Sequence, residues 1–286
     1  MSASRQTFDR PTPLPTAPQQ LLADYSLSQR LRSTYHDLWQ TLTERLRWSR
    51  GVVRETPAGR LPALSESQQR TIARLSERYA IRFEQELSEA TALRCYEYLD
   101  LLDRSLAPLA DVLPDKPTLH DVGSANGWYT SMLDAFWKPS RMTLVEADGY
   151  RLYADGHSRW DAAQGYVETR PHVEYCVADY CAVEQSAQVI TAFYPFVTPE
   201  PVLAWRLPLR WLVPQALFSR IAHNLSADGW FVMMNHGPDE AAVASSICES
   251  VGLRSVCRTP VTELLRARTR APVVSCWRRA GAVHPR

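Results

Sequence analysis

The amino-acid sequence predicts an α/β protein in which a helical region is followed by a single, mostly parallel sheet. In the second half of the 286-residue chain, short apolar segments alternate with helical ones, which is the order expected when crossover helices connect parallel strands. The expected strands cover residues 118–122, 142–146, 173–178, 188–193, 229–235, 253–259 and 272–277. These seven segments fit one sheet with helices on both faces.

Apolar periodicity predicts three helices in the first part of the chain. One is expected where large apolar residues recur at three- and four-residue steps, at Leu27, Leu31, Leu38, Trp39, Leu42 and Leu46. We expect this apolar face to pack against another apolar surface. A second helix is expected after a capping Ser67, with a shared face formed by Ile72, Leu75, Tyr79, Phe83 and Leu87. A third covers residues 89–106.

A proline-containing stretch at residues 108–117 separates the helical part of the chain from the part rich in strands. We therefore expect a domain boundary near Leu113. Residues 1–19 are polar and rich in proline, and we expect them to be disordered. Residues 20–112 would form a helical N-terminal region, and residues 113–286 would form the domain that contains the sheet.

The composition argues against several classes of function. A formal net charge of +1 provides no overall field for a polyanion, so we expect no nucleic-acid partner. The arginines within residues 254–279 alternate with apolar residues, and we interpret them as a solvent-exposed face. The six cysteines form no CxxC pair and have no histidine at zinc-ligand spacing, which predicts neither a metal site nor a disulfide framework. Because the start of the chain lacks a signal-peptide core and no later segment is apolar enough to span a membrane, we expect a soluble, cytoplasmic protein that does not bind membranes.

A turn of small residues follows the first expected strand. Asp121 ends the strand, and a helix is expected at residues 128–137. The loop between them contains Gly123, Ser124, Ala125, Asn126 and Gly127. Small side chains are needed where a backbone turns sharply and approaches a ligand closely. A dinucleotide fingerprint would require glycine at Ala125 and at Trp128, and the carboxylate of Asp121 would repel a pyrophosphate but attract a cationic ligand.

Acidic residues also end the next two expected strands. Glu146 ends the second strand, where a carboxylate can accept hydrogen bonds from both hydroxyl groups of a ribose. Asp179 follows the third strand, and Tyr180 places an aromatic ring beside it. One such acid by itself would be an ordinary strand-end residue. Three acids in succession favour a ligand site at the carboxyl edge of the sheet.

Together these residues resemble the cofactor site of class I S-adenosylmethionine-dependent methyltransferases. The first motif of that family is an acidic residue followed by small residues at alternate positions, here Asp121, Gly123, Ala125 and Gly127, with alanine in place of the middle glycine. The resemblance covers residues 119–279. It implies a Rossmann-like fold, with residues 226–229 as the turn before the fifth strand and the last two strands as a hairpin.

The resemblance also implies S-adenosyl-L-methionine as the cofactor. Residues of the loop, including Ser124 and Asn126, are then expected to contact it. Glu146 would bind the ribose hydroxyl groups, Asp179 would accept from the adenine amino group, and Tyr180 would offer an aromatic edge or face.

Methyl transfer requires an aligned nucleophile and, where the nucleophile carries a proton, a base. Residues 194–196 lie where the family's fourth motif lines the methyl-donor pocket, so Tyr194 is a candidate substrate residue; no Asn or Asp precedes the proline of this segment, which disfavours methylation of an exocyclic base nitrogen. The proline- and tryptophan-rich segment that follows either covers the site, with Trp205 and Arg206 contacting the substrate, or packs as a surface loop. His236, after the fifth strand, is the candidate base because its imidazole titrates near neutral pH.

The resemblance implies an enzyme that transfers a methyl group to an oxygen or a nitrogen of a small-molecule acceptor. Two alternatives are methylation of a protein or an RNA, with the N-terminal region as a docking module, and a noncatalytic scaffold with the same fold. The nearly neutral charge argues against RNA. A scaffold would not need three acids facing a cofactor. The acceptor and the oligomeric state are left open.

Overall fold

The computed structural model describes residues 25–281, so the disorder expected for residues 1–19 lies outside the described part of the chain. Seven strands form one sheet in the order β3-β2-β1-β4-β5-β7-β6. Their bounds are β1 Thr118–Val122, β2 Arg141–Glu146, β3 Val173–Val177, β4 Ala187–Phe193, β5 Leu225–Asn235, β6 Leu253–Pro260 and β7 Val273–Arg279. Neighbouring strands are parallel except that β7 runs antiparallel to both β5 and β6. The predicted fold class, a seven-stranded, mostly parallel, Rossmann-like sheet, is confirmed.

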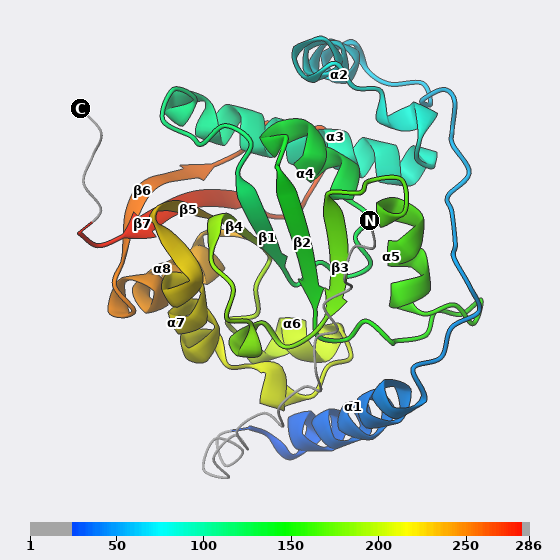
Figure 1. Ribbon diagram of the computed structural model, residues 1–286, viewed down its shortest axis with the longest axis vertical. Helices are drawn as coiled ribbons and strands as arrows, with labels where there is room; N and C mark the ends of the chain where they lie inside the picture. Colours follow the sequence, from blue (N-terminus) through cyan, green and yellow to red (C-terminus); the bar gives the residue numbers. More distant parts are fainter. Residues whose placement is uncertain (1–24, 282–286) are drawn as a thin grey trace, which may run out of the picture.

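Helices cover both faces of this sheet (Figure 1). The α-helices are α1 Leu27–Leu46, α2 Glu66–Tyr79, α3 Glu89–Leu106, α4 Thr130–Trp137, α5 Arg159–Val167, α6 Pro199–Ala204, α7 Pro214–Asn224 and α8 Pro238–Ser250. Helices α3, α4 and α5 share a core with one face, whereas α7 and α8 share a core with the other. Successive residues of β5 point alternately to these faces: Trp230 and Val232 pack on the α3 side, and Phe231 and Met233 pack on the α7 side.

The strand order creates a crevice at the carboxyl edge of the sheet. Strand β1 lies between β2 and β4, so the chain moves outward through β2 and β3 and then crosses back to β4. At such a switch point, the loops that follow neighbouring strands diverge and leave room for a ligand. Helix α3 contributes to the same core as the sheet through Tyr96 and Leu99, which are fully buried. The domain boundary near Leu113 stays a prediction.

Helix α2 differs in two details from the expectation. Its N-cap is Ser65, whose hydroxyl accepts from the backbone N–H of Gln68 while the Gln68 side chain accepts from the backbone of Ser65. The expected cap at Ser67 is therefore wrong, because the reciprocal capping box at Ser65 satisfies two N–H groups. The helix ends at Tyr79, since Ala80 has a φ of 53°. Phe83, expected on the same helical face, instead lies in a separate 3₁₀ turn and is buried.

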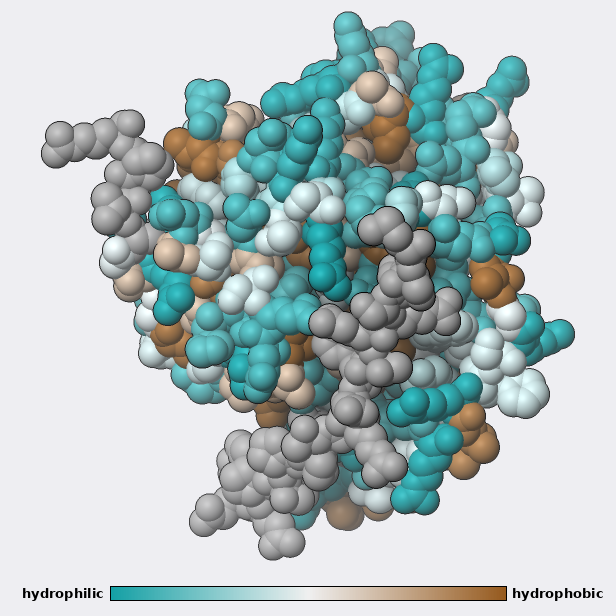
Figure 2. Space-filling view, viewed as in Figure 1, coloured by the Kyte–Doolittle hydropathy of each residue, from teal (hydrophilic) through white to brown (hydrophobic). Residues whose placement is uncertain are grey.

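Helix α1 packs its polar face against the rest of the protein, whereas its sequence predicts that the apolar face does so. Leu27 and Leu38 are each 67% exposed, whereas Ser33, His36 and Gln40 on the other side of the helix are buried. Figure 1 shows α1 at the lower rim of the molecule, and hydrophobic side chains are visible along that rim in Figure 2. The expectation that the apolar face packs against an apolar surface is wrong.

The surface that α1 covers explains this orientation. The polar side of α1 faces residues 199–211, a segment of short helical turns. Ser33 Oγ accepts from the backbone N–H of Leu209 at 2.9 Å, and Gln40 Oε1 accepts from the indole N–H of Trp211 at 2.7 Å. Backbone and indole N–H groups that are buried need acceptors, which leucine side chains do not supply.

Strand β5 also departs from its expected start. The turn expected at residues 226–229 lies inside the bounds of β5, because Leu225 already pairs with Ala187. The next pair joins Trp230 to Val189, so the register shifts and the four residues 226–229 are accommodated between the two pairs.

An extended strap, residues 47–64, connects α1 to α2 and crosses α5. The backbone N–H of Val53 donates to the carbonyl oxygen of Asp161 at 3.1 Å. A Cβ atom added to Gly165 of α5 would lie 1.8 Å from the carbonyl oxygen of Val53. The glycine is therefore required by the close approach of the strap.

We expect Gly165→Ala to destabilise the protein by about 1 to 3 kcal/mol, because the strap must move away from α5. Helix propensity alone predicts the opposite sign, a gain of about 1 kcal/mol. Urea unfolding followed by far-ultraviolet circular dichroism measures the difference. Gln164→Ala, one position earlier in the same helix, is the control and should change stability little; a stabilised Gly165→Ala variant would contradict the close approach.

Candidate functional site

The carboxyl edge of the sheet holds a cavity of about 760 Å³. This volume lies within the range of small-molecule sites. The loop after β1, the ends of β2 and β3, and the segments after β4 and β5 all contribute to its walls. The region near β1 to β3 is called the cofactor half here, and the region near β4, β5, α3 and the β6–β7 loop is called the acceptor half.

The loop after β1 is shaped by three residues with positive φ. The φ angles are 77° at Gly123, 51° at Ala125 and 70° at Gly127. A Cβ on Gly127 would also lie 3.2 Å from Thr130 Oγ1 and 3.3 Å from a methyl carbon of Leu144. Ala125 adopts a conformation that costs a residue with a Cβ about 1 to 2 kcal/mol. Its backbone is held on both sides, because its N–H donates to Glu146 and its carbonyl oxygen accepts from the hydroxyl of Tyr175.

Glu146 connects the loop to the end of β2. Its Oε2 accepts from the N–H of Ala125 at 2.7 Å, and its Oε1 accepts from the N–H of Asp148 at 2.8 Å. Each carboxylate oxygen has a second lone pair, so Glu146 can still accept from a ligand. The side chain lines the cavity although the residue is only 7% exposed.

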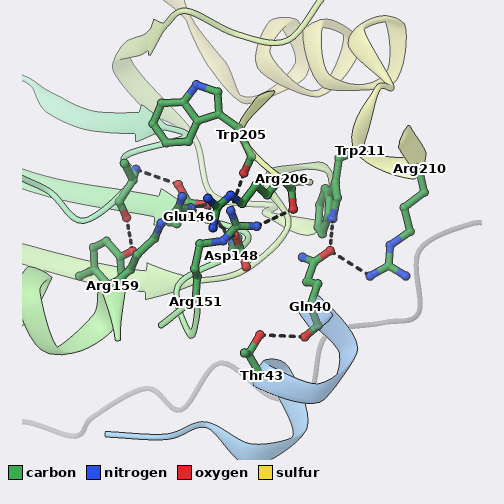
Figure 3. A network of polar contacts seen from close by, with 12 residues as sticks. Gln40, Thr43, Glu146, Asp148, Arg151, Arg159, Trp205, Arg206, Arg210 and Trp211 are labelled. Atoms are coloured by element: carbon green, nitrogen blue, oxygen red, sulfur yellow. Dashed lines mark hydrogen bonds and ion pairs between the residues drawn. The ribbon is translucent and has the colours of Figure 1, made fainter. Parts of the chain in front are cut away.

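An ion-pair cluster lies behind Glu146 (Figure 3). The guanidinium of Arg159 lies 3.5 Å from Glu146 and 3.3 Å from Asp148, and Arg151 lies 2.5 Å from Asp148. Burial raises the pKa of Asp148 to about 6, and the two arginines oppose this shift. Arg151 also donates to the carbonyl oxygens of Trp205 and Arg206, so the cluster ties the cofactor half to the tryptophan-rich segment.

Asp179 and Tyr180 continue the wall of the cofactor half. One carboxylate oxygen of Asp179 accepts from the N–H of Cys181 at 2.9 Å, and burial raises the pKa of Asp179. The hydroxyl of Tyr180 lies 3.2 Å from Nδ1 of His120. Burial lowers the pKa of His120 to about 4, so this imidazole is neutral at neutral pH and serves as a core partner of Tyr180.

Asp121 and Ser124 lie behind the cavity wall. Asp121 is fully buried and accepts from the hydroxyl of Tyr129 at 2.7 Å and from that of Thr191 at 2.6 Å. The hydroxyl of Ser124 donates to the carbonyl oxygen of Asp121 at 2.9 Å. Tyr129, in contrast, lines the cavity. Asp121 therefore holds the orientation of Tyr129 without lining the cavity itself.

The loop residues predicted for the cofactor divide in the same way. Gly123 and Ala125 line the cavity, whereas Asn126 and Gly127 are absent from its lining. Gly127 instead has a packing role, through its closeness to Thr130 and Leu144.

Two of the three residues predicted for the substrate, Tyr194 and Trp205, line the cavity, and Arg206 does not. The ring of Trp205 lies over the guanidinium of Arg159, beside the cofactor half. Arg206 is exposed, and its carbonyl oxygen accepts from Arg151 at 2.7 Å. Tyr194 has a φ of 59°, and its ring stacks on His236 with centroids 4.1 Å apart and planes inclined by 14°. Positive φ at a large side chain is strained and is concentrated at functional sites.

His236 lines the same half. Burial lowers its pKa, the carboxylate of Glu240 opposes the shift, and the guanidinium of Arg268 adds to it. The backbone N–H of His236 donates to Glu240 at 3.0 Å, which fixes the start of the loop. The lowered pKa favours the neutral imidazole, which can accept a proton.

The sequence analysis missed a group of residues that line the cavity: Arg94, Tyr98, Trp128, Arg266, Arg268 and Arg270. The expected solvent exposure of the arginines in residues 254–279 holds for Arg266 and Arg270, which are exposed although they line the cavity, whereas Arg268 is half-buried. In the sequence, the feature that could have revealed the three arginines of the β6–β7 loop is their spacing at every second residue. Arg94 and Tyr98 are one helical turn apart on α3.

No metal cluster is found within residues 25–281, where no three or more His, Cys, Asp or Glu side chains are arranged to hold an ion. In the same residues, no helix is both long and apolar enough to cross a membrane. All six cysteines are free.

Comparison with known proteins gives fold neighbours but no close relative. No protein-family model matches the chain, and no curated protein matches its sequence. An S-adenosylmethionine-dependent methyltransferase from Clostridium acetobutylicum is 8% identical, with a TM-score of 0.46 and coverage of 74% of this chain and 99% of that one. The CcbJ methyltransferase from Streptomyces caelestis is 12% identical, with a TM-score of 0.45 and coverage of 63% and 90%. A methyltransferase from Aquifex aeolicus is 11% identical, with a TM-score of 0.45 and coverage of 65% and 95%.

These likenesses concern the fold and carry no information about individual residues. The strand order and the antiparallel pairing of β7 define a class I methyltransferase-like fold. The roles of the site residues rest on the geometry described above.

The buried carboxyl of Asp121 generates a prediction about stability. Burial raises its pKa from 3.8 to about 6 although two hydroxyl groups donate to it. The folded protein thus binds this proton more tightly than the unfolded chain does, and its stability falls as the pH rises from about 4 to about 6. We expect Asp121→Asn to remove that loss, which amounts to roughly 2 to 3 kcal/mol.

Urea unfolding of both proteins at several pH values between 4 and 7 measures this effect. The stability of the variant relative to the wild type should rise across that range. A difference between the two proteins that is constant with pH would mean that Asp121 titrates normally.

Proposed function

We propose that the protein is an S-adenosylmethionine-dependent methyltransferase that acts on an oxygen or a nitrogen of a small-molecule acceptor. One observation carries the proposal: Glu146 and Asp179, at the ends of adjacent parallel strands, face the same cavity as the positive-φ loop after β1. This set provides carboxylate acceptors for ribose and adenine and a backbone that a ligand can approach closely. The cavity then continues past Tyr194 and His236, which leaves room for an acceptor.

When bound, S-adenosylmethionine supplies an electrophilic methyl carbon on a sulfonium, which a lone pair of the acceptor attacks. The residues of this chain would align the acceptor with that methyl carbon. Glu146 and Asp179 would hold the nucleoside end, and Arg94, stacked 3.8 Å from the ring of Trp128 directly after the loop, would neutralise the single carboxylate of the cofactor. Tyr194 would exclude water beside the reacting atoms, and Trp205, over Arg159, would cover the cofactor half. His236 would take the proton of a protic acceptor.

We expect micromolar binding of S-adenosylmethionine, and weaker binding by the variants Glu146→Ala and Asp179→Ala. Loss of hydrogen bonds to the ribose or the adenine should reduce the binding free energy by about 1 to 3 kcal/mol. Isothermal titration calorimetry measures the change, with circular dichroism to show that each variant is folded. Glu174→Ala, which removes an acid of β3 paired with Arg141 outside the cavity, is the matched control.

Two results would remove the proposed cofactor site. One is wild-type affinity in both acid variants. The other is no heat with S-adenosylmethionine but clear binding of NAD.

We expect His236→Ala to lower kcat by ~10² to 10⁴ while cofactor affinity stays nearly unchanged, because proton removal contributes that much in general-base catalysis. The lowered pKa of His236 implies that its neutral form is present at neutral pH, with activity falling as the imidazole becomes protonated in acid. The assay uses radiolabelled S-adenosylmethionine and an acceptor found by screening phenols, aromatic amines and aromatic acids. The acidic limb of the pH profile should disappear in the variant. Wild-type kcat with an unchanged pH profile would reject the role of base.

A further inference from the structure

The charges that line the cavity are unevenly distributed. Among the described residues, the acidic side chains in its wall are Glu146 and Asp179, both in the cofactor half. Arg266, Arg268 and Arg270 of the β6–β7 loop lie in the acceptor half, where no acidic side chain lines the wall. Arg159 also lines the cofactor half, where it pairs with Glu146 and with Asp148. The cofactor half thus carries charges of both signs, whereas the described wall of the acceptor half has arginines and no carboxylate.

The guanidinium of Arg268 is already bound by other residues of the protein. It lies 2.5 Å from the buried carboxylate of Glu97 and donates to the hydroxyl of Tyr194 at 2.9 Å. Burial acts to lower the pKa of Arg268, but Tyr194 and the carboxylate of Glu97 outweigh it and raise this pKa. Arg268 therefore fixes the position of Tyr194, and its charge is balanced by Glu97.

Arg266 and Arg270 remain as surplus positive charge. The nearest carboxylate of Arg266 is the same Glu97, at 3.5 Å, and Arg266 is still 45% exposed. Arg270 has no carboxylate partner within residues 25–281. Within the described residues, Glu97 is thus the one carboxylate paired with the three arginines of this loop, so three positive charges face one negative charge. The single carboxylate of the proposed cofactor would neutralise Arg94 and would leave this excess in place.

Aromatic rings stand beside these arginines. Tyr98 packs against Trp128 with ring centroids 5.0 Å apart and against Tyr194 with centroids 6.0 Å apart. Tyr194 in turn stacks on His236. Such rings offer faces and edges to a flat ligand. A Cβ on Gly237 would lie 3.4 Å from the Arg270 side chain, so Arg270 packs against the loop that begins with His236.

We propose that the methyl acceptor is a planar aromatic compound carrying a carboxylate or a phosphate, and that Arg266 and Arg270 bind this anionic group. The inference rests on the proposed methyltransferase function and specifies its substrate class. Guanidinium groups form paired, charge-assisted hydrogen bonds with both kinds of anion. Anchoring the anion beside Arg270 would place the ring next to the contacting pair Tyr98 and Tyr194, close to His236. An amine acceptor that carries a positive charge would be repelled from the same half.

The test compares matched aromatic probes on the intact protein saturated with S-adenosylhomocysteine. The probes are hydroxybenzoates, their neutral amides and the corresponding aryl phosphates, and binding is measured by calorimetry. We expect an anionic probe to bind at least ten times more tightly than its amide. The double variant Arg266→Ala/Arg270→Ala should lose that preference, while the double lysine variant should keep part of it because lysine retains the charge.

Arg141→Ala, which removes an arginine paired with Glu174 outside the cavity, is the control and should bind all probes like the wild type. Preference for the carboxylates or for the aryl phosphates identifies which anion the site takes. The proposal is overturned if anionic and neutral probes bind alike, if no anionic probe binds, or if the double alanine variant retains the preference.

The cofactor titration separates this inference from the function on which it rests. S-adenosylmethionine should bind the double alanine variant with wild-type affinity. If S-adenosylmethionine binds and the anionic probes do not, the substrate class is wrong and the methyltransferase function stands. If S-adenosylmethionine does not bind the wild-type protein, the proposed function itself fails.

Discussion

The carboxylate of Glu146 is the contact on which the arrangement of the site depends. It accepts from the backbone of Ala125 in the loop after β1 and from the backbone of Asp148 after β2. The first bond holds a residue with a Cβ in a left-handed conformation that it would otherwise leave. The second orients Asp148 toward Arg151 and Arg159. One side chain thereby sets the shape of the loop and the position of the ion-pair cluster, while a lone pair on each oxygen is left for a ligand.

The tryptophan-rich segment, residues 199–211, is stabilised by polar groups from two sides in addition to its own short helical turns. Arg151 donates to the carbonyl oxygens of Trp205 and Arg206 from the cofactor half. From outside, Gln40 of α1 accepts from Trp211, as Figure 3 shows. These external hydrogen bonds add to those within the short turns of the segment. The ion-pair cluster behind Glu146, the tryptophan-rich segment and α1 are therefore joined by a continuous chain of polar contacts.

The parts of the site found from the sequence were those encoded locally. A strand that ends in an acid, such as Glu146, and a loop of small residues can be recognised within a few positions, and parallel strands bring their carboxyl ends together. Arg94 and Arg268 could not be placed in this way, because the fold brings them together from α3 and from the β6–β7 loop. Alternation of arginines with small and apolar residues has the same pattern on an exposed strand and on a loop that covers a cavity. The orientation of α1 failed for a related reason: periodicity identifies an apolar face but does not say that the neighbouring surface is apolar.

The orientation of α1 reverses the usual relation between hydropathy and tolerance to substitution. Along this helix, a hydrophilic replacement at Leu31 or Leu38 would alter a side chain that already meets solvent. An apolar replacement at Ser33 or Gln40 would leave the N–H groups of Leu209 and Trp211 buried without an acceptor. In α1, therefore, the polar positions Ser33 and Gln40 should be sensitive to substitution, and the apolar positions Leu31 and Leu38 should tolerate it.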